Sequence, residues 1–316
     1  MRVLFLDTVH PVLEERLTKM GFTCEFDLDA PYGEILKHIN AYTGVVIRSR
    51  IPFDAELIEA AKNLKFIARS GSGLENIDVD AAKNAGIQVL NSPEGNMDAV
   101  GEHAIGMLLM LFNKLREGDR EVRRGIWNRE GNRGIELAKM TVGIIGYGKM
   151  GSALAKKLSG FGCEILAHDK YKSSFGNESV REVELDELKA TSDVISIHLP
   201  LSPETDYYVD EAFINSCGKP FFLVNTARGK HVKISALLQG LETQQIRGAC
   251  LDVLEYESKS FEKLSIDELP EDFKKLAEQT NVVLSPHVAG WTQESYIKLS
   301  SFLADKIEAL NLNALK

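Results

Sequence analysis

The sequence predicts an α/β fold, with parallel sheets covered by helices, and two observations carry this prediction. Short apolar runs alternate with helix-like stretches along the 316 residues, which is the pattern of a parallel sheet with crossover helices. One apolar run, 141–145, leads into the glycine-rich turn 146–151, which opens a helical stretch. The length suggests about two domains with a large core.

The first part of the chain contains the elements of one small α/β unit. Helices are expected at 11–20 and 54–62, the second with Asp54 as its N-cap. Strands are expected at four short apolar runs, namely 3–6, 44–47, 66–68 and 89–90.

A long apolar helix is expected next, at about 98–124. Its stretch 104–112 is apolar on nearly all sides, so we expect it to be buried between domains or between subunits. The alternative is that its own chain covers it completely. The apolar run is shorter than the roughly 20 residues that cross a bilayer, and charged residues flank it. We therefore expect no membrane insertion.

A second parallel sheet is expected in the remainder of the chain. Its central strands are short apolar runs that end in polar or helix-breaking residues, at 141–145, 165–169, 194–199, 221–225, 248–252 and 282–285. Ligands bind open parallel sheets outside the carboxyl ends of the strands. The residues that follow these runs are therefore the candidates for chemistry.

The glycine-rich turn predicts a dinucleotide site. Gly146 permits a tight turn, Gly148 lets a pyrophosphate approach the backbone at a helix N-terminus, and Gly151 lets the helix pack closely on its strand. Asp169 follows 18 residues after Gly151, where an acid accepts hydrogen bonds from ribose hydroxyls and favours NAD over NADP. Two nearby lysines weaken that preference. The alternative, a glycine turn that binds nothing, is disfavoured because strand, helix and acid are all in register.

Composition excludes several classes of function. The net charge of -9 argues against nucleic-acid binding through the general field of the protein. The four cysteines are scattered, without disulfide or metal spacing, as in a cytoplasmic protein with reduced thiols. No metal site is expected, and no serine lies in the context of a hydrolase nucleophile.

Three polar residues follow successive strands of the second sheet: Arg228, Glu257 and His287. Reduction of a 2-oxo acid requires a proton donor at the carbonyl oxygen, and an imidazole can give and take that proton near neutrality. Glu257 would stabilise the protonated ring through its other nitrogen. Arg228 would hold the substrate carboxylate with two parallel hydrogen bonds. Each residue alone could be a packed or surface side chain, so the hypothesis depends on their joint position.

Five segments in this order resemble the signatures of the D-isomer-specific 2-hydroxyacid dehydrogenase family. They lie at 146–151, 198–205, 224–229, 251–257 and 285–290, within a similarity that runs from about residue 40 to 300. The resemblance implies two Rossmann-like domains with the active site in the cleft between them. It places a discontinuous substrate-binding domain at 1–97 plus 290–316 and an NAD-binding domain at 98–289.

The resemblance also implies roles for individual residues. It assigns catalysis to Arg228, Glu257 and His287, and it places Asp252 near the nicotinamide amide. NAD is the implied cofactor. The residues expected to bind it are Gly146, Tyr147, Gly148, Lys149, Met150, Gly151, Asp169, His198, Leu199, Pro200, Thr205, Thr226, Ala227, Asp252 and Gly290.

Within the family, segments 47–49, 68–78 and 91–96 resemble the branch that oxidises 3-phosphoglycerate. Backbone N–H groups of the glycine-rich segment 70–73 would bind a carboxylate, and two arginines would meet the phosphate. The alternative is that these arginines form only surface ion pairs. The expected substrate-binding residues are Arg48, Arg69, Ser70, Gly71, Ser72, Gly73, Asn96 and Arg129, the last resembling a residue lent by a neighbouring subunit. Family members pair through the region of the long helix, so we expect a homodimer through the cofactor domain.

Departures from the family pattern limit this transfer. Ser258 stands where many relatives have proline after the catalytic glutamate, and an acidic, lysine-containing insertion follows at 259–276. We expect a solvated loop and short helix there, although a cover for the cleft or a contact with a partner is the alternative. The sequence ends at Lys316 after one helix. We therefore expect no C-terminal regulatory domain and no inhibition by serine.

Three functions remain open. The first is NAD-dependent oxidation of 3-phospho-D-glycerate to 3-phosphohydroxypyruvate, which feeds serine synthesis. The second is reduction of glyoxylate, hydroxypyruvate or another short 2-oxo acid with the same three catalytic groups. The third is a dinucleotide-sensing regulator similar to the corepressors that share this fold. Formate dehydrogenase is disfavoured because it has an amide where this chain has Glu257.

Overall fold

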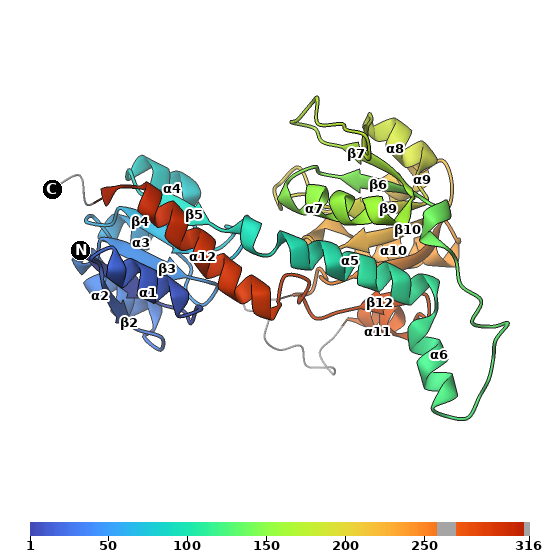
Figure 1. The fold of residues 1–316 in the computed structure, drawn as a ribbon, viewed down its shortest axis with the longest axis horizontal. Coiled ribbons are helices and arrows are strands. Elements are labelled where there is room, and N and C mark those ends of the chain that lie inside the picture. Colours follow the sequence, from blue (N-terminus) through green and yellow to red (C-terminus); the bar gives the residue numbers. More distant parts are fainter. Residues whose placement is uncertain (258–269, 313–316) are drawn as a thin grey trace. The chain divides into compact units, whose positions relative to one another are not determined.

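The computed structural model describes residues 1–257 and 270–312. The chain divides into two compact units (Figure 1). One unit comprises Met1–Asn96 and Trp291–Lys316, and the other comprises Met97–Gly290. Each unit has its own parallel sheet and its own core.

The first unit is built on a five-stranded sheet of order β2-β1-β3-β4-β5. The strands are β1 (Arg2–Phe5), β2 (Thr23–Phe26), β3 (Gly44–Ile47), β4 (Phe66–Arg69) and β5 (Gln88–Asn91). All of its strand pairs are parallel. The predicted helix 54–62 is present as α3 (Ala55–Ala60), and the carboxylate of Asp54 accepts a hydrogen bond from the Leu57 N–H at 3.0 Å, as an N-cap does.

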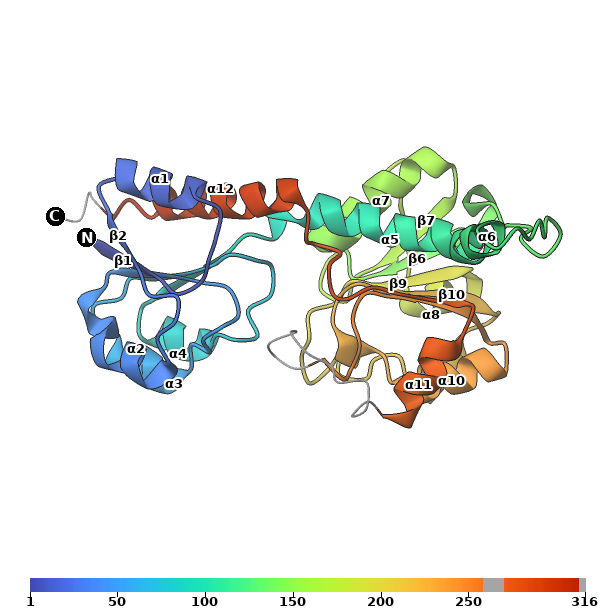
Figure 2. The same ribbon diagram turned by 90° about the horizontal axis from the view of Figure 1, so that it is seen from below.

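Helices cover both faces of this sheet (Figure 2). On one face pack α2 (Tyr32–His38), α3 and α4 (Val79–Asn84), and on the other pack α1 (Val12–Lys19) and α12 (Gln293–Ala309). Leu13 and Leu17 of α1 meet Leu303 of α12 in the second of these cores. The C-terminal helix therefore completes the unit that the first residues of the chain begin.

The second unit is built on a seven-stranded parallel sheet of order β12-β11-β10-β9-β6-β7-β8. The strands are β6 (Thr141–Ile145), β7 (Glu164–His168), β8 (Arg181–Glu182), β9 (Val194–Ile197), β10 (Phe221–Asn225), β11 (Ile246–Leu251) and β12 (Val282–Leu284). One face is covered by α5 (Met97–Phe112) and α7 (Lys149–Leu158). The other is covered by α8 (Leu185–Thr191), α9 (Glu211–Ser216), α10 (Ile234–Glu242) and α11 (Glu271–Glu278).

The prediction of one continuous helix at 98–124 is wrong. The helix breaks after α5 at Lys114, whose backbone is left-handed with φ of 49°, and α6 (Leu115–Val122) follows. The buried face of α5 packs within its own unit, where the ring of Phe112 lies 4.7 Å from that of Phe222. In residues 1–257 and 270–312, no helix has the length and apolar character that crossing a membrane requires.

The insertion predicted at 259–276 lies largely outside the described residues. The described part, from residue 270, consists mainly of α11, whose Leu276 is fully buried in the core of the second unit. The short helix expected in the insertion is therefore present and packs on the core, whereas the expected loop lies outside the described residues.

Candidate active site

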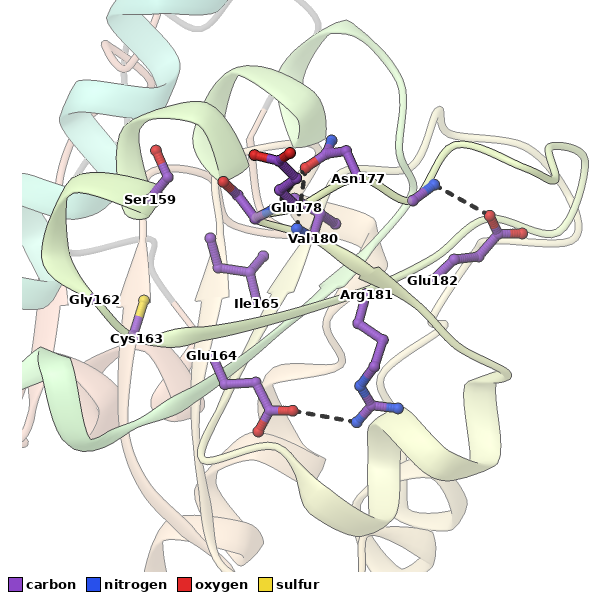
Figure 3. A pocket seen from close by; sticks show the side chains of 12 residues that line it. Ser159, Gly162, Cys163, Glu164, Ile165, Asn177, Glu178, Val180, Arg181 and Glu182 are labelled. Atoms are coloured by element: carbon purple, nitrogen blue, oxygen red, sulfur yellow. Dashed lines mark hydrogen bonds and ion pairs between the residues drawn. The ribbon is translucent and has the colours of Figure 1, made fainter.

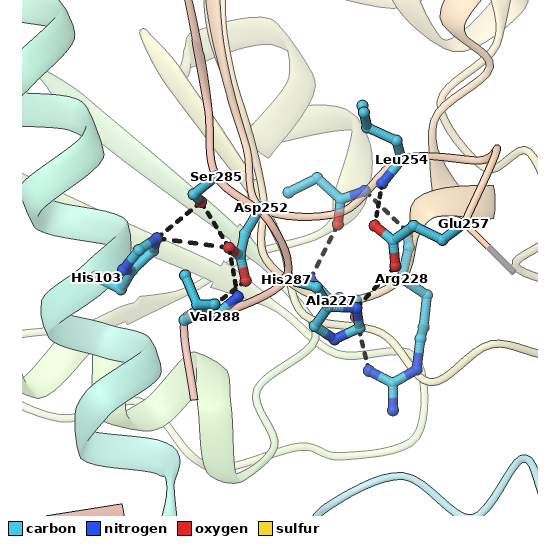
Figure 4. A network of polar contacts seen from close by, with 11 residues as sticks. His103, Ala227, Arg228, Asp252, Leu254, Glu257, Ser285, His287 and Val288 are labelled. Atoms are coloured by element: carbon cyan, nitrogen blue, oxygen red, sulfur yellow. Dashed lines mark hydrogen bonds and ion pairs between the residues drawn. The ribbon is translucent and has the colours of Figure 1, made fainter. Parts of the chain in front are cut away.

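The candidate catalytic residues follow three neighbouring strands. Because β10, β11 and β12 are adjacent and parallel, their carboxyl ends lie at one edge of the sheet. Arg228 follows β10, Asp252 and Glu257 follow β11, and His287 follows β12. Figure 4 shows these side chains gathered at that edge, with His103 of α5 beside them.

His287 and Glu257 form a hydrogen-bonded pair. Nδ1 of His287 lies 2.7 Å from Oε2 of Glu257. The other carboxylate oxygen of Glu257 accepts the N–H of Leu254 at 2.6 Å, which holds the carboxylate in place. The His287 side chain keeps 28% of its exposure. A substrate proton would therefore exchange with the second ring nitrogen, Nε2.

The loop that carries His287 is held by Asp252. The backbone of His287 is left-handed, with φ of 54°, and its N–H donates to the Asp252 carbonyl at 2.7 Å. The Asp252 side chain is 1% exposed and accepts the N–H groups of Val288 at 2.9 Å and Ala289 at 2.8 Å. The buried carboxylate therefore fixes residues 287–289 by direct contact.

The loop after β10 positions Arg228. Buried Asn225 shapes this loop, because its amide donates to the Arg228 carbonyl at 2.9 Å and accepts the Ala227 N–H at 3.1 Å. A Cβ on Gly229 would lie 2.0 Å from the carbonyl oxygen of Leu254, so only glycine fits where this loop meets the loop after β11. The guanidinium donates to the Ala227 carbonyl at 2.6 Å.

The three glycines of the predicted dinucleotide turn differ in what surrounds them. A Cβ on Gly146, where φ is 93°, would lie 2.5 Å from the carbonyl oxygen of His198, and one on Gly151 would lie 2.1 Å from the carbonyl oxygen of Gly146. A Cβ on Gly148 would meet nothing within 4 Å. The open space at Gly148, before the first residues of α7, fits the approach of a pyrophosphate to a helix N-terminus.

Asp169 stands at the end of β7 and joins two loops. Its carboxylate accepts the N–H of Tyr147 at 2.8 Å and that of Tyr171 at 3.0 Å. The nearby lysines are engaged elsewhere, since Lys170 pairs with Glu204 and Lys172 donates to the Tyr147 carbonyl at 2.9 Å. The surroundings of Asp169 therefore suit ribose hydroxyls better than a phosphate.

The loop after β9 contributes His198 and Thr205. Nε2 of His198 lies 2.8 Å from Oγ of Ser196. Desolvation lowers the pKa of His198 to about 4, so this ring is neutral at pH 7. The hydroxyl of Thr205 donates to the Pro200 carbonyl at 2.6 Å and accepts the Ser202 N–H at 2.9 Å, which ties the loop together.

Thr226 shows that this edge of the sheet has unused hydrogen-bonding capacity. Among the described residues, no group makes a hydrogen bond to its buried Oγ1. A buried hydroxyl without a partner is costly, and a bound dinucleotide could supply that partner. The remaining predicted cofactor residues lie in the first turn of α7, in the same loops and after β12: Lys149, Met150, Leu199, Ala227 and Gly290.

In the first unit, the candidate phosphate-binding arginines lie at adjacent strand ends. Arg69 pairs in register with Ile47, the residue before Arg48. The guanidinium of Arg48 lies 4.3 Å from the ring centroid of Trp291, and its backbone N–H donates to Asp7 at 2.6 Å. Burial lowers the pKa of Arg48, which a nearby anion would oppose. The two arginines are thus packed groups rather than freely extended surface side chains.

In the glycine-rich segment 70–73, two of the backbone N–H groups that were expected to bind an anion already donate to backbone carbonyls. The Ser70 N–H donates to the Ile47 carbonyl at 2.8 Å and the Gly71 N–H donates to the Arg69 carbonyl at 2.9 Å. Of the predicted donors to a substrate carboxylate, the N–H groups of Ser72 and Gly73 therefore remain as candidates. The Arg69 guanidinium lies so close to Gly71 that a Cβ there would be 1.7 Å from its nitrogen. Asn96 accepts the Ser72 hydroxyl at 2.6 Å and steadies the segment.

Arg129 belongs to the second unit, where it is exposed in the segment between α6 and β6. A broad surface hollow of about 830 Å³ is also present (Figure 3). Its lining includes Cys163 and Glu164 at the start of β7 and Arg181 of β8. Asp169 stands at the opposite end of β7, so this hollow is not the candidate site. The described ranges contain no group of His, Cys, Asp or Glu side chains arranged to hold a metal ion.

Two residues of the site were not anticipated from the sequence. Ser285 donates to Asp252 and contacts His103. His103 lies in a predicted apolar helix, and Ser285 opens the signature segment 285–290 but received no role of its own from the sequence. The strand-end rule identified Arg228, Glu257 and His287, which the structure brings to one edge of the sheet.

Comparisons with known proteins agree with this architecture. Residues 105–289 match the model of the D-isomer specific 2-hydroxyacid dehydrogenase, NAD binding domain. The chain is 34% identical over 309 residues to D-3-phosphoglycerate dehydrogenase of Archaeoglobus fulgidus, covering 97% of this chain and 56% of that one. It is 36% identical over 274 residues to hydroxypyruvate reductase of Thermotoga maritima, covering 87% of this chain and 86% of that one.

Solved structures show the same fold. D-lactate dehydrogenase with NAD+ from Lactobacillus jensenii has a TM-score of 0.82 and 26% sequence identity, with 98% of this chain and 96% of that chain covered. The chain spans about half the length of several phosphoglycerate dehydrogenases that it matches. The protein therefore belongs to the D-isomer-specific 2-hydroxyacid dehydrogenase family, and NAD is its cofactor.

Proposed function

We propose that this protein is an NAD-dependent dehydrogenase that oxidises 3-phospho-D-glycerate to 3-phosphohydroxypyruvate, a reaction that feeds serine synthesis. The observation that carries the oxidoreductase part is the hydrogen-bonded pair of His287 and Glu257 at the carboxyl edge of an NAD-binding domain. The pair supplies an acid–base group with a fixed ring orientation, which transfer of a hydroxyl proton requires.

The side chains have distinct roles in the oxidation. His287 takes the hydroxyl proton of the substrate at Nε2, while Glu257 at Nδ1 stabilises the imidazolium that forms. Arg228 binds the substrate carboxylate with its planar guanidinium. When bound, NAD would supply the acceptor for the hydride that leaves C2 of the substrate. In the reverse reaction the imidazolium returns its proton to the carbonyl oxygen.

Binding of NAD is assigned to the loops after β6, β7, β9 and β10. The open space at Gly148 and the first turn of α7 would take the pyrophosphate, and Asp169 would accept the ribose hydroxyls. Thr226 would gain a hydrogen-bond partner. These features of the chain itself fit a dinucleotide.

Arg48 and Arg69 are the proposed recognition groups for the substrate phosphate. Both residues lie at the carboxyl ends of the adjacent strands β3 and β4, and a guanidinium group is a strong ligand for a doubly charged phosphate. The similarity to a phosphoglycerate dehydrogenase over 97% of this chain supports the same substrate.

A second candidate is a reductase of hydroxypyruvate or glyoxylate, which would need no phosphate contact. The similarity to a hydroxypyruvate reductase, at 36% identity, favours it. A dinucleotide-sensing regulator is less favoured, because such a protein has no need of an ordered acid–base pair.

Steady-state oxidation of NADH distinguishes these candidates. Rates with phosphohydroxypyruvate, hydroxypyruvate and glyoxylate are compared for the wild type, Arg69→Ala and the exposed control Lys62→Ala. We expect the wild type to prefer the phosphorylated compound by roughly 100-fold, as one or two charge-assisted contacts provide. Only Arg69→Ala should lose this preference. Equal losses on all three substrates would refute phosphate recognition, and absence of turnover on all three would favour the sensor.

We also propose a homodimer in the cytoplasm. Large apolar side chains are exposed on α6 and the segment after it, and Trp127 is the most exposed of them at 74%. Such a surface is typical of an interaction site. Arg129 is in the same segment, which suits a residue lent to a partner subunit. All four cysteines are free thiols, as is usual in a reducing compartment.

A further inference from the structure

Three residues from separate elements form a chain of polar contacts behind the candidate catalytic loop. Oγ of Ser285 lies 2.6 Å from Oδ1 of Asp252, and Nε2 of His103 lies 2.9 Å from the same Oγ. Nε2 of His103 also lies 3.6 Å from Oδ1 of Asp252, which is too long for a hydrogen bond. His103 comes from the middle of α5, whereas the other two follow β12 and β11. Figure 4 shows this set, which we name the His103–Ser285–Asp252 network, beside His287 and Glu257.

The donors and acceptors in this network have a defined direction. The Asp252 carboxylate already accepts the N–H groups of Val288 and Ala289, so it acts as an acceptor. A serine hydroxyl has one proton, and the short 2.6 Å contact places that proton on the line to Asp252. Oγ of Ser285 must then accept a hydrogen bond from His103, whose Nε2 carries the hydrogen.

The contact with His103 favours the orientation in which the Ser285 hydroxyl points to Asp252 rather than to another acceptor. The sulfur of Met107 lies 3.7 Å from Oγ of Ser285 and is another acceptor toward which the hydroxyl could turn. A thioether is a weak acceptor. A donor at His103 occupies a lone pair of Oγ and leaves the serine proton to Asp252. The imidazole therefore selects the orientation that gives the buried carboxylate its third donor.

The carboxylate in turn determines the geometry of the catalytic loop. Its two oxygens hold the N–H groups of Val288 and Ala289, and the Asp252 carbonyl holds the N–H of His287. His287 has a φ of 54°, a left-handed conformation that is uncommon for residues other than glycine and that these contacts hold in place. Loosening Asp252 would therefore shift the ring of His287 relative to Glu257.

We propose that His103 is a positioning residue for the acid–base step. By donating its Nε2 hydrogen to Ser285 it directs the serine proton to Asp252, and Asp252 holds residues 287–289 in the conformation that orients the imidazole of His287. The inference rests on the acid–base role of His287 that is proposed above. It adds a residue of α5 that does not touch the imidazole of His287 in the structure.

Two substitutions at position 103 distinguish the loss of the hydrogen-bond donor from the loss of side-chain volume. His103→Ala removes the donor, and we expect kcat to fall about tenfold with little change in the KM for NADH, the size of effect expected for one lost hydrogen bond to an ordered polar group. His103→Gln places an amide N–H near the position of Nε2, so we expect kcat within about twofold of wild type. Ser285→Ala should resemble His103→Ala. Glu102→Gln, on the same helix and bonded to Lys157, is the matched control and should have no effect.

A second measurement follows the loop without turnover. In protein labelled with 13C-histidine, the His287 ring resonance is assigned by its disappearance in His287→Gln. We expect His103→Ala to shift or broaden this resonance and His103→Gln to restore it. An unchanged resonance together with wild-type kcat in His103→Ala would overturn the proposal, as would equal damage in the Ala and Gln variants.

The same series tests the proposed function separately. If His287→Gln keeps wild-type turnover, the acid–base assignment is wrong, whereas the resonance shifts still report whether His103 orders the loop. If His287→Gln is inactive and His103→Ala is unaffected in both measurements, only the positioning role is wrong.

Discussion

Oε2 of Glu257 lies 2.7 Å from Nδ1 of His287, although the two residues are 30 positions apart and follow different strands. The carboxylate is itself held by the N–H of Leu254. A charge fixed at this distance stabilises the protonated imidazole, the form that reduction consumes and oxidation produces.

Glu257→Gln preserves the shape of this pair and removes its charge. We expect the rate of 2-oxo acid reduction at pH 7 to fall roughly tenfold or more, within the range of general acid–base effects. Stopped-flow oxidation of NADH at pH 7 measures this rate. An unaltered rate would show that the charge of Glu257 is not required.

Asp169→Ala tests the choice of cofactor. Loss of the carboxylate removes an acceptor for ribose hydroxyls and a repulsion of the 2′-phosphate, so the ratio of kcat/KM for NADPH to that for NADH should rise about tenfold or more. Glu178→Ala removes an exposed acid from the same unit and serves as the control. A constant ratio in Asp169→Ala would contradict the assigned ribose contact.

Gly151→Ala tests the close packing of α7 on its strand. The new Cβ would lie 2.1 Å from the carbonyl oxygen of Gly146, and backbone cannot move aside easily. We expect the free energy of unfolding to fall by about 2–3 kcal/mol, with weaker binding of NADH. Gly160→Ala is the matched control, because a Cβ there meets nothing within 4 Å. Urea denaturation and NADH fluorescence titration supply the two readouts, and equal stability of both variants would count against the packing described.

The neutral state of His198 predicts a pH-dependent stability. Desolvation lowers its pKa in the folded protein from 6.5 to about 4, so the unfolded chain binds this proton more readily. The contribution of neutral His198 to the free energy of unfolding is fully present above about pH 6.5 and is lost as the pH falls towards 4. It amounts to roughly 2–3 kcal/mol. His198→Asn cannot titrate, so its free energy of unfolding should fall less between pH 7 and 4.5 than that of the wild type. Parallel curves for the two proteins would rule out His198 as a source of acid sensitivity.

Trp127→Glu tests the proposed dimer. A charge on this exposed side chain should weaken a contact that buries it, so the weight-average mass in sedimentation equilibrium should fall towards 35.0 kDa at micromolar concentration. Tyr171→Glu, at a similarly exposed aromatic position (80%), is the control. A wild-type protein that remains monomeric at all concentrations would exclude the dimer.

Central strands were predictable from the sequence because they are buried on both faces and form continuous apolar runs. The runs 44–47, 194–199 and 221–225 contain β3, β9 and β10. The edge strands β2 and β8 lack this signal, because no residue of β2 is fully buried and both residues of β8 are exposed. The run 282–285 has the signal and was predicted as a central strand, but β12 lies at the edge of its sheet. The break between α5 and α6 depends on one left-handed residue, Lys114, with no glycine to mark it.

The site was predictable to the extent that it follows from strand order. Arg228, Glu257 and His287 could be chosen because parallel strands end at a common edge. The contact of His103 with Ser285 joins residues 182 positions apart, and its direction depends on the backbone donors around Asp252. Which N–H groups of segment 70–73 remain for a substrate depends on the backbone carbonyls that the others contact. No local sequence pattern encodes the His103–Ser285 contact or these backbone hydrogen bonds.

The left-handed backbone at His287 also bears on how substitutions at this position are interpreted. Asparagine tolerates that conformation well and β-branched residues do not. A valine would therefore combine loss of the imidazole with a distorted loop, whereas asparagine would report the missing proton carrier alone. If every amino acid is placed at position 287, most variants should be inactive but should differ in their affinity for the cofactor. We expect that affinity to be higher for residues that tolerate positive φ, whatever their polarity.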